Sequence, residues 1–472
     1  MKPAEWMQLL TTKKCTVIGL GVSNLPLIDF LLARGVCVTA RDQKNLERLG
    51  TVGDQLLQKG VRLVIGDNYL DGIDEEVIFR SPGVHPHTPE IAEAVARGVI
   101  LSSEMELFLD LTPARVIGIS GSDGKTTTTT LTHLILEAQA KKNGYGRVFV
   151  GGNIGEPLLP HLDEMTDKDI AVVELSSFQL YTMKHSVQIA AITNLSPNHL
   201  NWHSDMQDYV NAKTNLYLHE PNEHAVFNAE NETTLALARE RGGRLTYFSS
   251  KKSSYEEFEL RDGERAVYVR DGVIRLWDGA REHSYFSPDK ILLPGRHNLE
   301  NYMTAIALTF GLADADTVEE IAQTFGGVEH RLELVRTLDG VKYYNSSIDS
   351  SPTRTAAALS ALREKPIVIC GGSDKGISFA PLAEVLCKRA KAVVLLGETK
   401  EKIRASLEEQ GATLPVCEAT TLAEAVEAAR GLAQSGDTVL LSPACASFDM
   451  FDNFADRGRR FKDIVNQFQS KE

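Results

Sequence analysis

The chain has 472 residues and a formal net charge of -14 at pH 7, with 50 lysine and arginine residues against 64 aspartate and glutamate residues. This balance disfavours an extended surface for nucleic acid or anionic lipid, although it permits a local basic pocket for phosphates. A hydrophobic fraction of 43% and a charged fraction of 24% are typical of a soluble globular protein. The length predicts roughly three domains of about 150 residues each.

Two further features of the composition favour a cytoplasmic protein that does not contact membranes. The N-terminal segment lacks the long apolar core of a signal peptide, and no apolar run approaches the ~20 residues of a spanning helix. The six cysteines are dispersed without a CxxC pair. This pattern favours reduced, mostly buried thiols over a disulfide framework or a zinc site.

The first part of the chain has the pattern of a Rossmann-like βαβ unit. We expect a strand from Cys15 to Leu20, a helix from Leu25 to Ala33 and a strand from Val36 to Ala40. Asp42 lies about 20 residues beyond the glycines, where a ribose hydroxyl would be bound. Asn24 replaces the third glycine of the dinucleotide fingerprint, so NAD and a different nucleotide are equally allowed.

Ser81-Pro82-Gly83 follows another short apolar strand, Val77 to Arg80. A turn at the carboxyl end of such a strand is where open α/β sheets bind ligands. The same residues are also consistent with an ordinary loop.

The segment from Gly118 to Thr130 predicts a phosphate-binding loop between a strand and a helix. Backbone N–H groups and the positive helix end would face one anion, Lys125 would add a point charge, and the Thr126 hydroxyl could bind Mg²⁺. Ile119 occupies the first glycine position of the usual G-x-x-x-x-G-K-[ST] pattern. Taken alone, the remaining hexapeptide is equally consistent with an ordinary glycine-rich turn.

Three later residues bear on this interpretation. Glu174 ends an apolar strand that begins at Ala171, which is where a phosphate-loop protein places a Mg²⁺ ligand. His199 follows the strand Ala190 to Leu195 and could be a metal or phosphate ligand, or a hydrogen-bonded loop histidine. Lys213 lies on a helix predicted from Asp208 to Leu218 and has the pattern of a solvated surface lysine.

The second half of the chain continues the alternation of strands and helices. Val267 to Trp277 predicts a β-hairpin with a type I′ turn at Asp271-Gly272. A helix that begins near Leu293 places Asn298 and Asn301 one turn apart, facing the same ligand. Beyond Glu329 we expect a third, doubly wound domain. Its strands are predicted at Val341 to Tyr344, Pro366 to Cys370, Ala392 to Leu396 and Thr438 to Leu441, with helices near Pro381, Thr399 and Leu422.

The ordered motifs resemble the ATP-dependent Mur ligases over nearly the whole chain. They are GSDGKTT, GGNIG, ELSSFQL, TNLSPNHL, the helical Lys213, PGRHNxxN, EHR, GGSDKG and SPACASFDMFDNF. The resemblance implies an α/β fold of three domains: a Rossmann-like UDP-sugar domain at 1–107, a central P-loop ATPase-like domain at 108–328, and a C-terminal Rossmann-like domain at 329–472 that binds the amino acid.

Within the family the chain is most similar to members that add D-glutamate to UDP-N-acetylmuramoyl-L-alanine through an acyl phosphate. The resemblance implies ATP and Mg²⁺ as cofactors, a role in cytoplasmic peptidoglycan precursor synthesis, and a monomer without a nucleic-acid or membrane partner.

The resemblance also assigns roles to residues. The catalytic residues are Lys125, His199 and Lys213, of which Lys213 would be carbamylated, and the Mg²⁺ ligands are Thr126, Glu174, His199 and Lys213. The ATP-binding residues are Gly121, Ser122, Asp123, Gly124, Lys125, Thr126, Thr127, Asn298, Asn301 and Arg331. The UDP-sugar site has Ser23, Asn24, Asp42, Ser81, Asn153, Ser176 and Gln179, and the D-glutamate site has Lys375, Ser447 and Phe454.

One segment departs from the family pattern. The family commonly shows Asn-Asp-Ser-Lys after a strand of the third domain, whereas this chain has Asn-Ser-Ser-Ile-Asp from Asn345 to Asp349. We expect Asp349 and Arg354 to replace the missing acid and lysine.

Other function classes account for fewer of these residues. A sibling Mur ligase with a different amino-acid acceptor or a folylpolyglutamate-type ligase is the nearest alternative, but neither explains the C-terminal SPACASFD segment. A nicotinamide-dependent oxidoreductase would leave Lys125, Glu174 and His199 without a purpose. A non-catalytic nucleotide-binding scaffold would not need an intact set of metal-site residues.

Overall fold

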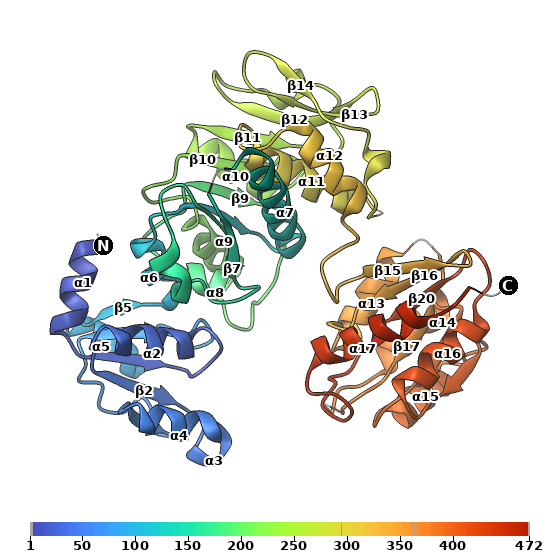
Figure 1. The fold of residues 1–472 in the computed structure, drawn as a ribbon, viewed down its shortest axis with the longest axis horizontal. Helices are drawn as coiled ribbons and strands as arrows, with labels where there is room; N and C mark the ends of the chain where they lie inside the picture. Colours follow the sequence, from blue (N-terminus) through green and yellow to red (C-terminus); the bar gives the residue numbers. More distant parts are fainter. Residues whose placement is uncertain (1–2, 145, 294, 363, 375, 471–472) are drawn as a thin grey trace. The chain divides into compact units, whose positions relative to one another are not determined.

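The computed structural model describes residues 3–144, 146–293, 295–362, 364–374 and 376–470. The chain forms two compact units, Met1–Thr324 and Phe325–Glu472. Three β-sheets organise it, two in the first unit and one in the second, and helices pack on each sheet (Figure 1). The α/β fold class predicted from the sequence is confirmed, with one sheet for each of the three expected domains.

The first sheet has five parallel strands in the order β3-β2-β1-β4-β5. β1, β2 and β4 are buried along their whole length, as expected for parallel strands covered on both faces. The loops that follow these three strands therefore meet at one edge of the sheet. The strands are β1 (Cys15–Ile18), β2 (Val38–Asp42), β3 (Arg62–Ile65), β4 (Val77–Arg80) and β5 (Ile100–Ser102). The helices are α1 (Pro3–Thr12), α2 (Asn24–Ala33), α3 (Leu46–Leu49), α4 (Thr51–Gln58), α5 (Pro89–Ala96) and α6 (Glu104–Leu111).

The central sheet has nine strands in the order β14-β13-β12-β11-β10-β9-β6-β8-β7. The pairs from β12 to β7 are parallel, whereas β13 and β14 add an antiparallel edge. The strands are β6 (Arg115–Ser120), β7 (Val148–Gly152), β8 (Ile170–Glu174), β9 (Ile189–Ile192), β10 (His224–Asn228), β11 (Leu245–Phe248), β12 (Arg265–Arg270), β13 (Val273–Trp277) and β14 (Glu282–Ser284).

Helices of the central part cover this sheet, and α7 packs directly against α11 and α12 (Figure 1). The α-helices are α7 (Lys125–Asn143), α8 (Ser177–Leu180), α9 (Met206–Thr214), α10 (Glu232–Arg241), α11 (Arg296–Thr309) and α12 (Ala315–Thr324). The 3₁₀ helices are η1 (Leu159–Glu164), η2 (Tyr255–Phe258) and η3 (Pro288–Lys290). Because α7 starts directly after β6 and its loop, it points its N-terminus at the carboxyl edge of the sheet.

The second unit has a six-stranded sheet in the order β15-β16-β20-β17-β18-β19. All its strand pairs are parallel except β15 with β16. The strands are β15 (Glu333–Leu338), β16 (Val341–Asn345), β17 (Ile367–Cys370), β18 (Ala392–Leu395), β19 (Val416–Glu418) and β20 (Thr438–Leu441). The helices are α13 (Pro352–Ala361), α14 (Ala380–Arg389), α15 (Lys400–Glu409), α16 (Leu422–Leu432) and α17 (Phe454–Gln467).

The predicted hairpin is confirmed, since β12 and β13 pair antiparallel around Asp271 and Gly272, whose φ angles are 52° and 71°. The helix that carries Lys213 differs from its prediction. It starts at Met206 because the Asp205 side chain accepts a hydrogen bond from the Asp208 backbone N–H and caps it. It ends at Thr214 rather than at Leu218, because the next residues form tight turns in which the Leu216 and Tyr217 N–H groups donate three residues back. Among the described residues, no helix combines the length and apolar character needed to cross a bilayer.

Candidate active site

The loop between β6 and α7 can form only because two of its residues are glycine. Gly121 has a φ of 141°, and a Cβ at that position would lie 2.0 Å from the Thr193 Oγ1. Gly124 has a φ of 78°, and its Cβ would lie 2.4 Å from the Asn301 Oδ1. Positive φ and close neighbours both exclude a side chain. The two glycines therefore let the loop backbone approach Thr193 and Asn301 more closely than any other residue would allow.

A segment after β9 holds this loop in place. The Ser122 N–H donates to the Asn194 carbonyl at 2.8 Å, and the Thr193 hydroxyl donates to the Asp123 carbonyl at 2.6 Å. The Ser122 hydroxyl donates to the Ser196 carbonyl at 3.0 Å and lies 2.9 Å from the Tyr209 hydroxyl. Ser122 is thus buried in the support of the loop, whereas Asp123 is exposed.

Two predicted nucleotide residues lie beside the start of α7. Asn301 on α11 accepts a hydrogen bond from the Thr128 hydroxyl at 3.3 Å and donates to the Asn298 Oδ1 at 3.3 Å. Lys125, the first residue of α7, donates from Nζ to the Ser122 carbonyl at 2.9 Å. The structure therefore brings Lys125 and the Asn298–Asn301 pair to one place, and their role in nucleotide binding stays a prediction.

Glu174 ends β8 next to the loop and is 1% exposed. Its Oε1 accepts a hydrogen bond from the Asn153 Nδ2 at 2.8 Å. Its Oε2 is buried and has no hydrogen-bond partner among the described residues. A buried carboxylate oxygen without a partner is costly unless a cation or donor occupies the space beside it.

Lys213 is also buried, with an exposed fraction of 2%, and is not the solvated surface lysine that its helix pattern indicated. Its Nζ donates to the Ser120 hydroxyl at 3.0 Å and to the Gly121 carbonyl at 2.9 Å. Burial and the positive charge of Lys125 hold the pKa of this amine well below its usual range, and Glu174 acts in the opposite direction. The lowered pKa raises the neutral, nucleophilic fraction of the amine at neutral pH.

His199 completes the group of cationic and potentially cationic side chains. Its φ is 56°, and its ring lies 4.9 Å from the Phe178 ring. Burial lowers the pKa of His199, and Lys125 and Lys213 lower it further. A neutral imidazole is the form that binds a metal ion.

These groups fit a phosphate chain with a divalent cation. Lys125, Lys213 and His199 influence one another electrostatically, and Glu174 is the carboxylate that acts on Lys213. In the described part of the chain, no three His, Cys, Asp or Glu side chains are placed to hold a metal ion by themselves. A cation here would need further oxygen ligands, which the Thr126 hydroxyl, phosphate oxygens and a modified lysine are able to supply.

Ser176 and Gln179, predicted to line the sugar site, form the capping box of α8. The Ser176 hydroxyl donates to the Gln179 Oε1 at 2.9 Å, and the Ser176 N–H donates to the same oxygen at 3.0 Å. Asn153 is tied to Glu174 on the neighbouring strand. All three therefore lie at the carboxyl edge of the central sheet.

The predicted UDP-binding residues gather at the carboxyl edge of the first sheet. The Asn24 Nδ2 donates to the Gly19 carbonyl at 2.7 Å, and the Asp42 Oδ2 accepts from the Leu20 N–H at 2.7 Å. Ser81 packs against Gly19, where a Cβ would lie 2.7 Å from the Ser81 Cβ. Ser23 directly precedes α2. Asn24 and Asp42 are buried and fix the shape of the loop.

In the second unit, the ends of β16, β17 and β20 meet at one edge. The Gly371 N–H donates to the Pro443 carbonyl and the Ser373 N–H donates to the Ala446 carbonyl. Ser447 is buried, and Phe454, at the start of α17, is 40% exposed. Arg331 is exposed near the start of this unit. Lys375 lies outside the described residues.

Asp349 and Arg354 differ in their surroundings. The Asp349 Oδ2 accepts a hydrogen bond from the Ser442 hydroxyl at 2.8 Å, and burial raises the pKa of this carboxyl. Arg354 donates to the Ile348 carbonyl at 3.2 Å. Their role as replacements for the family's acid and lysine remains a prediction.

Known protein families match the chain in three consecutive segments. The Mur ligase MurD-like N-terminal domain matches residues 13–103, the Mur ligase middle domain matches residues 119–309, and the Mur ligase glutamate ligase domain matches residues 330–445. A "UDP-N-acetylmuramoylalanine--D-glutamate ligase" of Clostridium beijerinckii is 45% identical over 467 residues, covering 98% of each chain. The protein of that name from Acetivibrio thermocellus is 41% identical over 474 residues, covering 99% of each chain.

The chain belongs to the Mur ligase family. Solved Mur ligases share its fold: MurF from Acinetobacter baumannii has a TM-score of 0.54 at 16% identity, covering 83% of this chain and 90% of MurF. MurC from Thermotoga maritima has a TM-score of 0.51 at 19% identity, covering 96% of this chain and 99% of MurC.

Several residues that build the site of this Mur ligase were not found from its sequence. Ser120, Thr193, Ser196 and Tyr209 support the loop or Lys213, and they are ordinary residues in strands, loops and helices. His203 is buried between Asp208 at 3.0 Å and Ser177 at 2.9 Å. Arg457 donates to the Cys445, Ala446 and Ser347 carbonyls and so joins two strand ends of the second unit. Thr193 and Ser196 do lie in the TNLSPNHL motif, and His203 follows it closely, but the motif did not show which of its residues hold the loop.

Proposed function

We propose that this Mur ligase joins the alanyl carboxylate of UDP-N-acetylmuramoyl-L-alanine to the amine of D-glutamate, with hydrolysis of ATP to ADP and phosphate. One observation carries the proposal. The buried Glu174 and Lys213, the half-buried Lys125 and the exposed His199 lie around a glycine-built phosphate loop, in a chain that matches relatives with this printed activity over 98% of its length. The MurD-like match of the N-terminal domain favours the same member of the family.

The proposed chemistry has two steps. The alanyl carboxylate attacks the γ-phosphorus of ATP and ADP leaves, which gives an acyl phosphate. The D-glutamate amine then attacks the acyl carbon, inorganic phosphate leaves, and the amine loses its proton as the amide forms. Lys125 and the N–H groups at the start of α7 would stabilise the negative charge on the phosphates.

Mg²⁺ would neutralise further phosphate charge when bound, and Thr126, Glu174 and His199 are the residues that would hold it. The buried, partnerless Oε2 of Glu174 supports this assignment. We further propose that Lys213 reacts with carbon dioxide to form a carbamate. The low pKa of its amine supports this step, because only a neutral amine attacks carbon dioxide. The carbamate would present oxygen atoms toward the same cation.

The remaining assignments form part of the same proposal. The loops with Ser23, Asn24, Asp42 and Ser81 would hold the uridine diphosphate, and Asn298 and Asn301 would lie near adenine. Ser447, Phe454 and Lys375 would bind D-glutamate. The domain limits of 1–107, 108–328 and 329–472, a cytoplasmic location and a monomeric state complete the proposal.

The test is phosphate release by purified protein with ATP, Mg²⁺ and UDP-N-acetylmuramoyl-L-alanine, in the presence and absence of D-glutamate. We expect release that needs both substrates, together with a product whose mass has increased by one glutamyl residue. Lys125→Ala should abolish release, whereas Lys142→Ala, which removes a lysine paired with Glu320 far along α7, should not. Release that requires the dipeptide precursor and a diamino acid would overturn the D-glutamate assignment.

A further inference from the structure

A cavity of about 800 Å³ lies at the amino edge of the central sheet. Its wall contains the first residues of five parallel strands: Arg115 of β6, Ile189 of β9, His224 of β10, Leu245 of β11 and Arg265 of β12. Arg244, which precedes β11, and Phe310, which follows α11, also belong to this wall. Because the phosphate loop follows the last residue of β6, the cavity and the proposed active site lie at opposite ends of the same strand.

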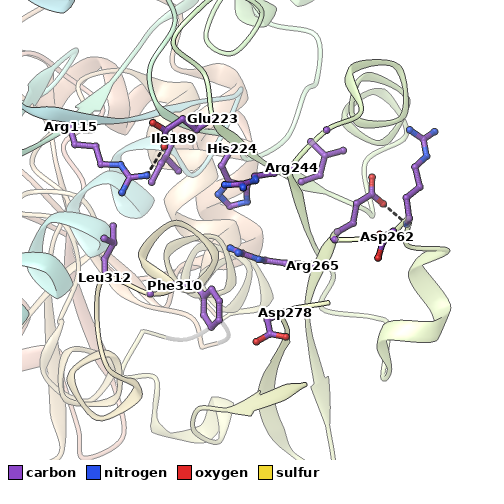
Figure 2. A pocket seen from close by; sticks show the side chains of 16 residues that line it. Arg115, Ile189, Glu223, His224, Arg244, Asp262, Arg265, Asp278, Phe310 and Leu312 are labelled. Atoms are coloured by element: carbon purple, nitrogen blue, oxygen red, sulfur yellow. Dashed lines mark hydrogen bonds and ion pairs between the residues drawn. The ribbon is translucent and has the colours of Figure 1, made fainter. Parts of the chain in front are cut away.

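Positively charged side chains dominate the centre of the cavity. Figure 2 shows Arg115, Arg244 and Arg265 arranged around His224. Burial lowers the pKa of His224 to about 3, and the charges that lower it further come from Arg265, Arg241, Arg115 and Arg244. The electrostatic environment of this imidazole is therefore that of a cationic pocket, in a protein whose net charge is strongly negative.

Three of the four acidic residues in the wall, Glu223, Glu264 and Asp278, have partners of their own, whereas the fourth, Asp262, is exposed. Glu223 forms an ion pair with Arg115 at 2.7 Å, and Asp278 forms one with His283 at 2.7 Å. Glu264 accepts a hydrogen bond from the Arg261 N–H at 2.8 Å. Within the described residues, the guanidinium groups of Arg244 and Arg265 have neither a hydrogen bond nor an ion pair. Arg265 instead lies over the Phe310 ring at 5.0 Å.

We propose that this cavity is a second anion-binding site, which takes a small phosphorylated molecule. Guanidinium groups bind phosphate through paired N–H donors. The arginines here approach from three separate elements, and a tetrahedral phosphate has more acceptor oxygens, in more directions, than a planar carboxylate. The volume falls in the range of small-molecule sites, about 300–1,000 Å³. The site is independent of the ligase chemistry at the other edge.

The probe is inorganic pyrophosphate, titrated calorimetrically at low ionic strength without divalent cations, because salt screens exposed charges. Lys125→Ala serves as the background, since it weakens binding at the phosphate loop. In that background we expect R244Q/R265Q to lower the affinity at least tenfold, equivalent to about 1.4 kcal/mol. Arg97→Gln, which removes one positive charge at the end of α5 and outside the cavity wall, should leave the affinity within about twofold.

Binding of pyrophosphate that is unaffected by R244Q/R265Q, or that falls equally with Arg97→Gln, would overturn the proposal. Arg244→Gln alone keeps the test decisive if the double variant does not fold, because Arg244 is exposed. That single variant should lower the affinity by about threefold or more, and an unchanged affinity would count against the site. The ligase assay reports on the proposed active site and not on the cavity. If R244Q/R265Q keeps full ligase activity but no longer binds pyrophosphate, the result would support a second site.

Discussion

Lys213 shows how burial changes the chemistry of a single residue. Its amine is enclosed beside Ser120 and Gly121, with Lys125 lowering its pKa. If a carbamate forms there, Lys213→Ala should lower kcat by about 100-fold or more, the size of effect seen when one group that stabilises transition-state charge is removed. Added formate or acetate should restore part of the activity by supplying the missing carboxylate.

Steady-state phosphate release with and without formate checks this prediction. Lys142→Ala is the control, because that lysine lies on the neighbouring α7 and is 45% exposed. Full activity of Lys213→Ala would show that the amine does not contribute to catalysis. Lost activity without rescue would restrict Lys213 to a structural role.

The single carboxyl group of Glu106 should make the stability of the fold depend on pH. Burial raises the pKa of this carboxyl on α6 to about 8, and Arg80 acts in the opposite direction. The folded state therefore keeps a proton that the unfolded chain loses above about pH 4.3. The stability that this protonation gives is fully present below the unfolded pKa and is lost as the pH rises toward 8.

Glu106→Gln cannot ionise and should avoid this loss. We expect its unfolding free energy, relative to that of the wild type, to increase between pH 5 and pH 8.5 by on the order of 1 kcal/mol or more, since one pKa unit corresponds to about 1.4 kcal/mol. Urea unfolding at both pH values measures the difference. Glu93→Gln, whose side chain is 75% exposed, is the control and should show no such increase. If the difference in unfolding free energy between Glu106→Gln and the wild type were the same at both pH values, the raised pKa of Glu106 would be contradicted.

At the scale of elements, the loop between β6 and α7 depends on Gly121. A Cβ there would lie 2.0 Å from the Thr193 hydroxyl, and the φ of 141° is unfavourable for any L side chain. Gly121→Ala should therefore displace the loop and lower kcat/KM for ATP at least tenfold, because small misplacements at a reacting centre are costly. Gly144→Ala is the matched control. Gly144 ends the same helix with a φ of 67° and nothing within 4 Å, so its substitution should cost only about 1–2 kcal/mol of stability.

Kinetics and thermal unfolding of the two variants separate these effects. Loss of stability without loss of activity in Gly144→Ala would match the expectation. Equal kinetics for Gly121→Ala and the wild type would show that the loop tolerates a side chain, and that the geometry around Thr193 does not control ATP use.

The same loop shows what could be predicted from the sequence and what could not. The alternation of apolar strands and helices predicted β6, β8 and the start of α7, because parallel strands buried on both faces are continuous apolar runs. The contacts that hold the loop join residues far apart in the chain, such as Ser122 and Ser196, which are 74 positions apart. Such contacts follow from the packing of strands side by side and leave no periodic signal. The burial of Lys213 was missed for the same reason, since its helix pattern is that of a surface helix.

At the scale of the whole molecule, the proposed sites are distributed over three sheets. The carboxyl edges of all three carry the loops that were singled out from the sequence, which agrees with the general rule for ligand sites in α/β sheets. The arginine-lined cavity at the amino edge breaks that rule. Its residues come from different strands and loops, so no local motif in the sequence pointed to it.

The final prediction concerns movement of the two compact units during the reaction. The proposed ATP and UDP-sugar residues belong to Met1–Thr324, whereas the proposed D-glutamate residues belong to Phe325–Glu472. The amine of D-glutamate can attack the acyl phosphate only at near-contact distance, so the substrates must align the units before the amide forms. We expect the radius of gyration in solution scattering to fall when a non-hydrolysable ATP analogue, UDP-N-acetylmuramoyl-L-alanine and D-glutamate are all present, and to change less with any one alone. Lys125→Ala, which should bind the nucleotide weakly, should not contract under the same conditions. An unchanged radius of gyration in a protein saturated with all three ligands would mean that the units are already aligned, so that closure contributes nothing to the rate.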